Sequence, residues 1–346
     1  MRLAISVVVL LGFGGGRARA DGATGTFSVG AGYNPDAGFV GAAEVAQDDL
    51  FHSGQRLALS AELSSLEERF AIDHVIRNVA NTGLELSSQL LYDNRKLPGF
   101  TREGIGGSVG LGYHVSRTTR VFVKYRVERV ATSLLDPLAT ARATMPGEAP
   151  PSGDATIAAL GAGVSYDTRD GAIPRHGTCL ELFAETADPT LGSSAAVQRF
   201  TGRYEHAEPL GPLTLRFSGH GELVTTPDVA GVPRSERLYH AGNADVRGYA
   251  IDPFDRGSNA VAVGHLELEA PVWRRAGLAV AGFIDAGISR EQHPTFGGVA
   301  NVVRRSVGGS VIWRSPIGAM RLDLAVPLDG TDRHPRIMFW LPGAAL

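Results

Sequence analysis

The sequence predicts an all-β protein, a closed antiparallel barrel of sixteen strands that crosses a membrane. Apolar and polar residues alternate with a period of two along most of the chain, as they do in strands with one apolar face. Charges of both signs crowd the polar face, as a hydrated lumen requires. After the first twenty residues, no stretch reaches the roughly eighteen apolar residues of a membrane-spanning helix.

Residues 1–20 have the features of a secretory signal. Arg2 supplies a positive start, residues 3–13 are apolar, and Ala-Arg-Ala at 18–20 fits a small-residue cleavage site. The apolar run is too short for a spanning helix. We therefore expect export of a mature chain, residues 21–346, that forms one barrel domain.

The charge balance and the cysteine count exclude several classes of protein. The whole chain has 33 basic and 36 acidic residues, and the predicted signal removes three arginines and no acid. The resulting acidic balance argues against nucleic-acid binding, which favours a basic face. Cys179 is the single cysteine, so no internal disulfide can hold the exported chain.

Residues 211–223 show the alternation most clearly. Positions 213, 215 and 217 are Leu, Leu and Phe, while positions 214, 216 and 218 are Thr, Arg and Ser. The same period recurs in 56–63, 120–129, 265–270 and 319–326. A soluble sandwich with its apolar faces inward is the alternative. The dense charge on the polar faces, and strands of about ten residues, the length that crosses a bilayer at a tilt, favour the membrane barrel.

Sixteen alternating segments lie between turn signals, and bacterial membrane barrels have even strand numbers. They lie near residues 25–33, 37–46, 54–64, 68–77, 81–92, 103–114, 118–129, 155–167, 176–187, 196–207, 212–225, 258–272, 276–286, 302–314, 318–327 and 335–342. Short connections such as 167–171 and 209–211 are expected at the periplasm, and the long connections 130–154 and 226–257 outside.

The connection 226–257, called loop 6 below, is long enough to be unusual unless it is functional or disordered. Apolar residues are spread through it, which indicates that it folds back into the barrel mouth: Leu238, Tyr239, Val246, Tyr249, Ile251 and Phe254. Inside the barrel, Arg247 would need a carboxylate. Strand parity places Glu267, Glu269 and Asp285 on the lumen side. The alternative is that Arg247 is an ordinary solvated loop charge.

Several segments resemble the barrel of the BamA-like superfamily (surface-antigen type), which comprises outer-membrane assembly factors, two-partner secretion transporters and organellar relatives. ERLYHAGNADVRGY (236–249) is similar to its sixth outer loop, whose V-R-G-F/Y motif enters the lumen. VAGFIDAGI (280–288) resembles its F-x-D-x-G strand, and 307–328 its penultimate hairpin. Segments 43–63, 164–182 and 258–272 also match.

The resemblance implies a latch in which Arg247, followed by Gly248 and Tyr249, pairs with lumen acids on the next two strands. By position these acids are Glu267 and Asp285. The resemblance also implies a location in the outer membrane of a Gram-negative bacterium, and a structural rather than catalytic role for the latch.

The chain departs from the family pattern at both ends. Members usually carry periplasmic POTRA domains before the barrel, whereas the first segment here begins a few residues after the predicted cleavage site. We therefore expect a member of the POTRA-less subgroup. Members commonly end on an aromatic residue, whereas this chain ends on Leu346 with Pro342 nearby, and proline cannot donate to a sheet ladder. Either the seam between the first and last strands is short there, or 342–346 is a tail.

A weak seam suggests a function. Gly30 and Gly32 weaken the first strand beside Val29, and Phe339 and Pro342 lie on the last strand. A barrel that opens sideways exposes a strand edge that can template a client strand. We therefore expect insertion or translocation of protein, or of lipid. The expected partners are outer-membrane lipid, unfolded outer-membrane clients and a separate periplasmic or lipoprotein helper.

Two other functions stay open at this point, as do the client and the oligomeric state. The first is a passive channel or scaffold lined by paired strand charges: Arg120, Arg126, Arg216, Glu222, Arg321 and Asp323. The second is an enzyme, suggested by the proximity of Ser235, Glu236 and His240. The chain has no H-E-x-x-H pair, so we expect no catalytic residue, cofactor or metal.

Overall fold

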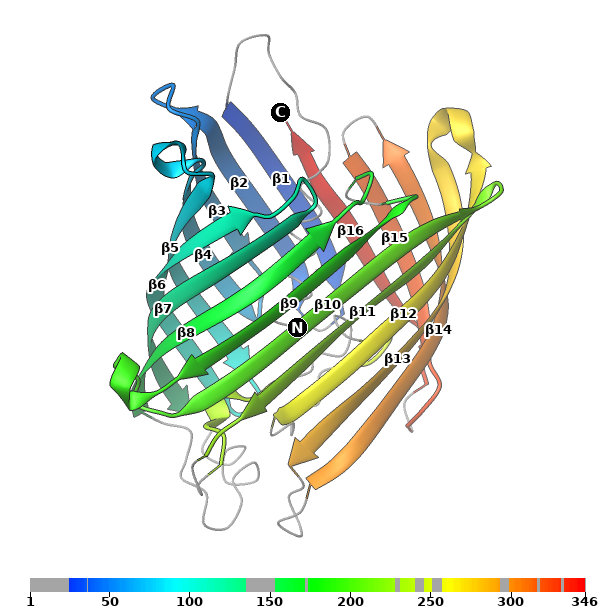
Figure 1. Cartoon of the computed structure of the whole chain (residues 1–346). Helices are drawn as coiled ribbons and strands as arrows, with labels where there is room; N and C mark the ends of the chain where they lie inside the picture. Colours follow the sequence, from blue (N-terminus) through cyan, green and yellow to red (C-terminus); the bar gives the residue numbers. More distant parts are fainter. Residues whose placement is uncertain are drawn as a thin grey trace.

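A computed structural model describes residues 25–345 except 36, 135–152, 172–173, 228–230, 240–245, 251–256, 293–298, 316–317 and 331–332. The predicted signal, 1–20, lies outside the described residues. Sixteen antiparallel strands pair in chain order, and β1 pairs with β16 to close the barrel (Figure 1). The predicted sixteen-stranded fold is therefore confirmed.

The strands follow the predicted segments closely. They are β1 Gly25–Asn34, β2 Gly38–Leu50, β3 Gln55–Leu63, β4 Glu67–Ile76, β5 Leu84–Leu97, β6 Phe100–His114, β7 Thr119–Leu134, β8 Gly153–Asp167, β9 Gly177–Ala187, β10 Val197–Leu210, β11 Leu213–Thr225, β12 Ser258–Trp273, β13 Leu278–Gln292, β14 Val299–Ser315, β15 Gly318–Pro327 and β16 Arg336–Ala345. Single turns of 3-10 helix occur at η1 Val79–Asn81, η2 Pro189–Leu191, η3 Arg234–Glu236 and η4 Arg274–Ala276. No helix within the described ranges is long and apolar enough to span a bilayer.

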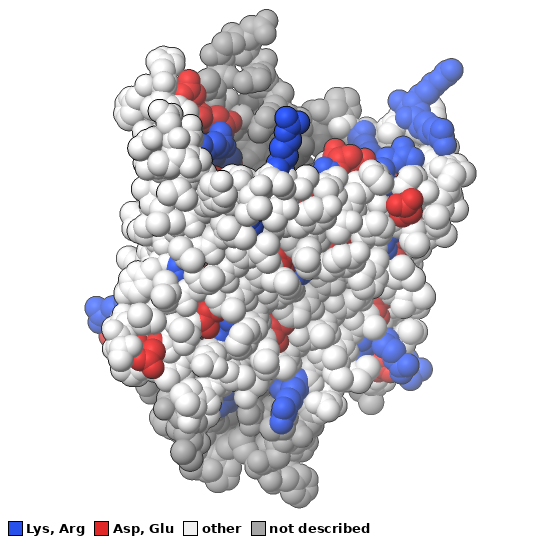
Figure 2. Space-filling view, viewed as in Figure 1, with Lys and Arg blue, Asp and Glu red and all other residues white. Residues whose placement is uncertain are grey.

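Side chains alternate between the two faces of the wall, as the period of two predicts. On β13, Ile284 is 55% exposed whereas Asp285 is fully buried. On β11, Phe217 is 44% exposed whereas Arg216 is 9% exposed. Figure 2 shows a wall covered mainly by uncharged side chains, with charged groups projecting at the rims. The apolar face therefore points outward and the polar face inward.

The two rims of the barrel differ in their connections. One rim holds the start of β1, the end of β16 and a set of compact turns (Figure 1). We call it the short-turn rim, and its connections include 51–54, 77–83, 115–118, 168–176, 211–212 and 274–277. The opposite, long-loop rim carries the connections 135–152 and 226–257. The two longest connections thus share one rim, as predicted; that the short-turn rim faces the periplasm stays a prediction.

The strand β16 has the shortest pairing in the barrel. It makes five register pairs with β1 and five with β15, whereas β13 and β14 share fifteen. The register shifts between Val29 and Ala31, opposite the stretch of β16 that contains Pro342. Pairing then continues to Ala345, so the alternative of a free tail from residue 342 is wrong. A bulge places the proline where the ladder is already interrupted.

Candidate functional site

Arg247 contacts the acid that the sequence predicted most directly. Its Nε and Nη2 donate to the two carboxylate oxygens of Asp285 at 2.7 Å each, and its backbone N–H donates to the same carboxylate at 3.2 Å. Asp285 points inward from β13 and is fully buried. The planar guanidinium thus makes the forked contact that a lysine cannot make.

Two more carboxylates approach the same guanidinium. Asp323 of β15 lies 3.4 Å from Nη1 of Arg247, although the sequence placed it only among the pore charges. The predicted contact with Glu267 is an ion pair at 3.7 Å, longer than the contact with Asp285. Glu267 also accepts from Arg216 at 3.0 Å and from Arg321 at 3.1 Å. Arg247 therefore joins a network that links β11, β12, β13 and β15.

An aromatic ring supports the guanidinium from one side. Arg247 lies over Phe283, with 3.4 Å between its Cζ and the ring centroid. Such stacking adds an electrostatic attraction between the cation and the ring face. Gly308 of β14 makes the position possible, because a Cβ at that residue would overlap the Phe283 ring. The F-x-D pattern of β13 thus supplies both the ring and the acid.

The residues on either side of Arg247, Val246 and Gly248, also contact the barrel wall closely. Val246 is buried, and its Cγ2 lies 2.7 Å from where a Cβ of Gly287 would be. Gly248 has φ +93°, and a Cβ there would meet Ala325 at 3.2 Å. A non-glycine residue at 248 would therefore be strained by its backbone and crowded by β15.

The hydroxyl of Tyr249 joins β14 to the connection that follows β15. It donates to the backbone oxygen of Arg305 at 2.7 Å and accepts from the backbone N–H of Asp329 at 3.1 Å. Hydrogen bonds from the Arg305 side chain lower the pKa of the Asp329 carboxyl below its ordinary value. The four residues Val246–Tyr249 thus contact three consecutive strands, β13, β14 and β15.

Gly287→Ala is expected to destabilise the folded barrel by about 1–3 kcal/mol, because the new methyl group would force Val246 out of its seat. The measurement is the temperature at which the folded band disappears on a semi-native gel. Gly282→Ala on the same strand is the matched control, since nothing lies within 4 Å of its Cβ position. Equal shifts for the two variants would show that the Val246 contact carries no stability.

A second ionic cluster holds loop 6 against a different part of the inner wall, at β6 and β10. Glu236 of η3 is 2% exposed and lies 3.4 Å from Arg102 of β6 and 3.1 Å from Arg199 of β10. Arg102 also pairs with Asp93 at 3.3 Å and with Glu128 at 2.7 Å. Sequence reasoning missed this anchor, although parity places both arginines on the inner face.

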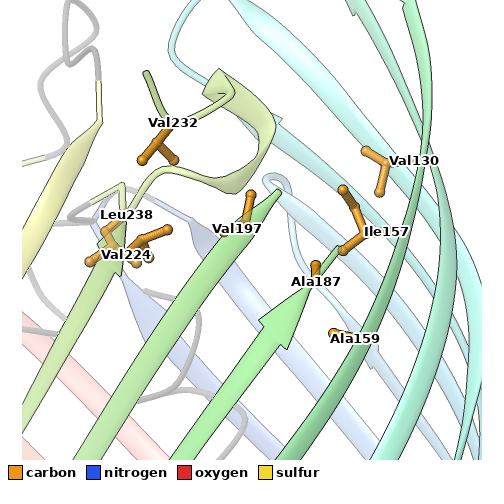
Figure 3. Close-up of a cluster of buried hydrophobic side chains, with 8 residues drawn as sticks. All are labelled: Val130, Ile157, Ala159, Ala187, Val197, Val224, Val232 and Leu238. Carbon is orange, nitrogen blue, oxygen red and sulfur yellow. The ribbon is translucent and has the colours of Figure 1, made fainter. Parts of the chain in front are cut away.

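Apolar side chains complete the seat of the first half of loop 6. Val232 and Leu238 are buried against inward residues at the long-loop ends of β7 to β11 (Figure 3). Tyr239 packs edge-on against the buried ring of Phe100, with 5.7 Å between the ring centroids. The backbones of Leu238 and Ser258 exchange two hydrogen bonds of 2.8 and 2.6 Å. Two described parts of loop 6, residues 231–239 and 246–249, therefore contact the inner side of the barrel wall.

The remaining candidates are placed as follows. The predicted pore charges that the structure describes are paired: Arg120 with Glu85, Arg126 with Glu185, Arg216 with Glu267 and Glu269, Glu222 with Arg199, and Arg321 with Glu267 and Asp323. Glu236, considered beside Ser235 as a hydrolytic group, is engaged by arginines. His240, Ile251 and Phe254 lie outside the described residues. Within the described ranges, no three His, Cys, Asp or Glu side chains gather as a metal site.

The fold and the seated V-R-G-Y segment define a class: an outer-membrane barrel with its charged network inside. A family model of the Omp85 superfamily domain matches residues 49–339, and the chain belongs to this superfamily. The resemblance to the BamA-like barrel is therefore confirmed. The location in the outer membrane follows from the barrel fold and from the relatives described in the next two paragraphs.

Two curated relatives are each described as an outer membrane protein assembly factor BamA. The protein from Nitratidesulfovibrio vulgaris is 25% identical over 88% of this chain, and that from Neorickettsia risticii is 22% identical over 88%. The chain spans 39% and 42% of their lengths.

Solved barrels show the same fold. The BamA of Haemophilus ducreyi, solved without POTRA domains 1–3, has a TM-score of 0.77 at 18% identity over 94% of this chain and 70% of its own. CdiB of Escherichia coli has a TM-score of 0.64 at 11% identity over 93% of this chain and 63% of its own.

Proposed function

We propose that this protein inserts polypeptide into the outer membrane, or translocates it across, through a seam that opens between β1 and β16. The short pairing of β16 on both sides is the observation that supports this most strongly. Relatives that are described as outer membrane protein assembly factors support the same class of activity. We also infer that the barrel works with a separate periplasmic or lipoprotein helper.

The pairing of β16 makes the seam the least costly place to open. Phe339 and Trp340 are paired on both sides, whereas residues 336–338 pair with β15 and residues 341, 344 and 345 pair with β1. Each net hydrogen bond lost costs about 0.5–1.5 kcal/mol, so a five-pair seam opens more readily than a fifteen-pair one. The exposed edge of β1 would then offer free N–H and C=O groups to a client strand.

Loop 6 would act as a conformational lock rather than as a catalytic element. We expect the loop as a whole to close the lumen, because its described residues are anchored to both β6 and β10 on one side and β13 to β15 on the other. Widening the seam would then require the C-terminal strands to move with the V-R-G-Y segment or to release it. If the strands move together with the segment, client passage at the seam leaves this lumen closure intact.

A disulfide across the seam tests the proposal. Gly32 and Trp340 face each other in the register of β1 and β16, and Gly32 faces Val40 across β1 and β2. With Cys179→Ser in the background, Gly32→Cys plus Trp340→Cys is expected to stop insertion of an unfolded outer-membrane barrel into proteoliposomes. Gly32→Cys plus Val40→Cys is the matched control and should leave insertion intact.

Insertion that continues with the oxidised seam would overturn the seam mechanism. Photoreactive residues at Val29, Phe339 and in the turn near Arg169 then identify the partner in native membranes. Capture of unfolded clients or of a helper supports an assembly role. If these sites react only with lipid and with each other, and a wide steady conductance is recorded, the passive channel replaces the proposed function.

A further inference from the structure

Exposed arginines without a protein partner gather on the short-turn rim. The guanidinium groups of Arg77, Arg117, Arg175, Arg274 and Arg275 are exposed and make no ion pair or hydrogen bond with any described residue. On the long-loop rim, the described cations in the same situation are Lys96, Arg290 and Arg333. The difference is notable because most other described arginines are paired.

Several acids of the short-turn rim already have partners. Asp49 accepts from the backbone N–H of Gly54 at 2.7 Å, and Asp167 pairs with Arg169 at 2.7 Å. Asp170 accepts from the backbone N–H of Arg175 at 2.9 Å, an interaction that leaves the Arg175 guanidinium free. Among the described residues, no carboxylate of the rim therefore pairs with these guanidinium groups. An anion that pairs with these guanidinium groups would have to come from outside the described residues.

Exposed apolar side chains lie beside three of these arginines, as expected for residues at the level of lipid headgroups. Trp273 is 61% exposed and directly precedes Arg274 and Arg275, while Val115 is 62% exposed and lies two residues before Arg117. The indole N–H of the half-exposed Trp313 donates to the backbone oxygen of Ala276 at 2.9 Å, which fixes a second indole at this turn. Exposed tryptophans mark the membrane–water interface. Figure 2 shows basic side chains projecting from the upper rim with acidic ones beside them, and further basic side chains at the lower part of the barrel.

We propose that these five arginines form a phosphate-binding belt that holds the headgroups of phospholipids in the leaflet around the short-turn rim. Arginine is suited to this task because its planar fork can donate two hydrogen bonds to one phosphate. Each basic residue near an anionic membrane surface is worth roughly a fivefold gain in binding. Anionic phospholipids are therefore bound in preference to zwitterionic ones. The belt would fix the vertical position of the barrel in the membrane.

The belt is tested on the full chain, folded from urea into vesicles. Vesicles with one quarter phosphatidylglycerol in phosphatidylethanolamine are compared with vesicles of zwitterionic lipid alone, at low and at high salt. The wild type is expected to fold about tenfold faster in the anionic vesicles at low salt, and the gain should vanish at high salt. The five-fold arginine-to-glutamine variant of the belt should lose most of this gain.

The long-loop rim supplies the matched control. The combined variant Lys96→Gln, Arg290→Gln and Arg333→Gln should keep most of the anionic-lipid gain. Phospholipid that copurifies with the folded proteins gives a second readout that does not depend on folding rate, and the belt variant should retain about half as much phosphatidylglycerol as the control.

Equal gains and equal retained lipid in both variants would overturn the proposal. So would loss of an acidic protein partner from the belt variant with lipid retention unchanged. Neither readout requires insertase activity, so this outcome is separate from that of the proposed function.

Discussion

Arg247→Ala is expected to lower the free energy of unfolding by about 3–5 kcal/mol, the range measured when one partner of a buried ion pair is removed. Asp285 is fully buried and receives both of its 2.7 Å side-chain hydrogen bonds from Arg247. Without the guanidinium, the carboxylate keeps His265 at 3.0 Å and loses its permanent cation. The measurement is the temperature at which the folded band is lost on a semi-native gel.

Three companion variants make this prediction specific. Asp285→Ala should produce a similar loss, and the double variant should cost less than the sum by roughly 0.5–3 kcal/mol. Arg247→Lys should recover only part of the loss, because an ammonium cannot make the fork. Arg129→Ala is the surface control and should cost less than about 1 kcal/mol, since Arg129 and Asp154 are 70% and 57% exposed. Full additivity of the first two substitutions would mean that the pair does not interact.

The alternation of side chains predicted the fold because it is a local property that a barrel uses everywhere. Each of the sixteen segments corresponds to a strand, and the strands mostly extend the predicted segments at their ends, as 302–314 extends to β14 at 299–315. The end of the chain was harder to predict. Considered alone, Pro342 is expected to interrupt the hydrogen-bond ladder. In the barrel, a register shift between β1 and β16 accommodates it. The sequence of one strand does not reveal its register with the partner strand.

The latch was predictable in part for the same reason. Parity places Asp285 and Glu267 inward, and the resemblance linked them to Arg247. Parity does not give the height of a side chain along the barrel axis, which depends on the stagger between strands. Asp323 therefore appeared as a pore charge rather than as a partner of Arg247 at 3.4 Å, and the Gly308 opening for Phe283 was not anticipated.

The cluster around Glu236 shows the limit of sequence reasoning more sharply. Glu236 is separated from Arg102 by 134 positions, and the nearness of Ser235 and His240 in the chain suggested catalysis instead. The sequence shows an acid in a long loop and inward arginines on distant strands. Only the closed barrel reveals that they lie close enough to pair. Gly104 is part of the same arrangement, because a Cβ there would overlap the carboxylates of Asp93 and Glu128.

Arg102→Ala is expected to destabilise the barrel by about 3–5 kcal/mol, as much as loss of the V-R-G-Y arginine, although it lies far from that motif. Arg102 is 4% exposed and pairs with three carboxylates, those of Asp93, Glu128 and Glu236. Removing Arg102 takes one positive charge away from three carboxylates that are buried or nearly buried. The measurement is again thermal unfolding on a semi-native gel, with loss of protease protection of loop 6 as a second readout.

Glu236→Gln decides whether this cost is electrostatic. Glutamine keeps the side-chain shape and a hydrogen-bond acceptor for Arg199 but removes one negative charge. In the Arg102→Ala background it should recover part of the lost stability, because it removes one of the acids that lost its cation. In the wild-type background it should instead destabilise, since Arg102 and Arg199 both lose a charged partner. The same substitution is thus expected to act with opposite signs in the two backgrounds. If Glu236→Gln destabilises both proteins equally, Arg102 supports loop 6 by packing rather than by charge, as the alkyl stem of a buried arginine can.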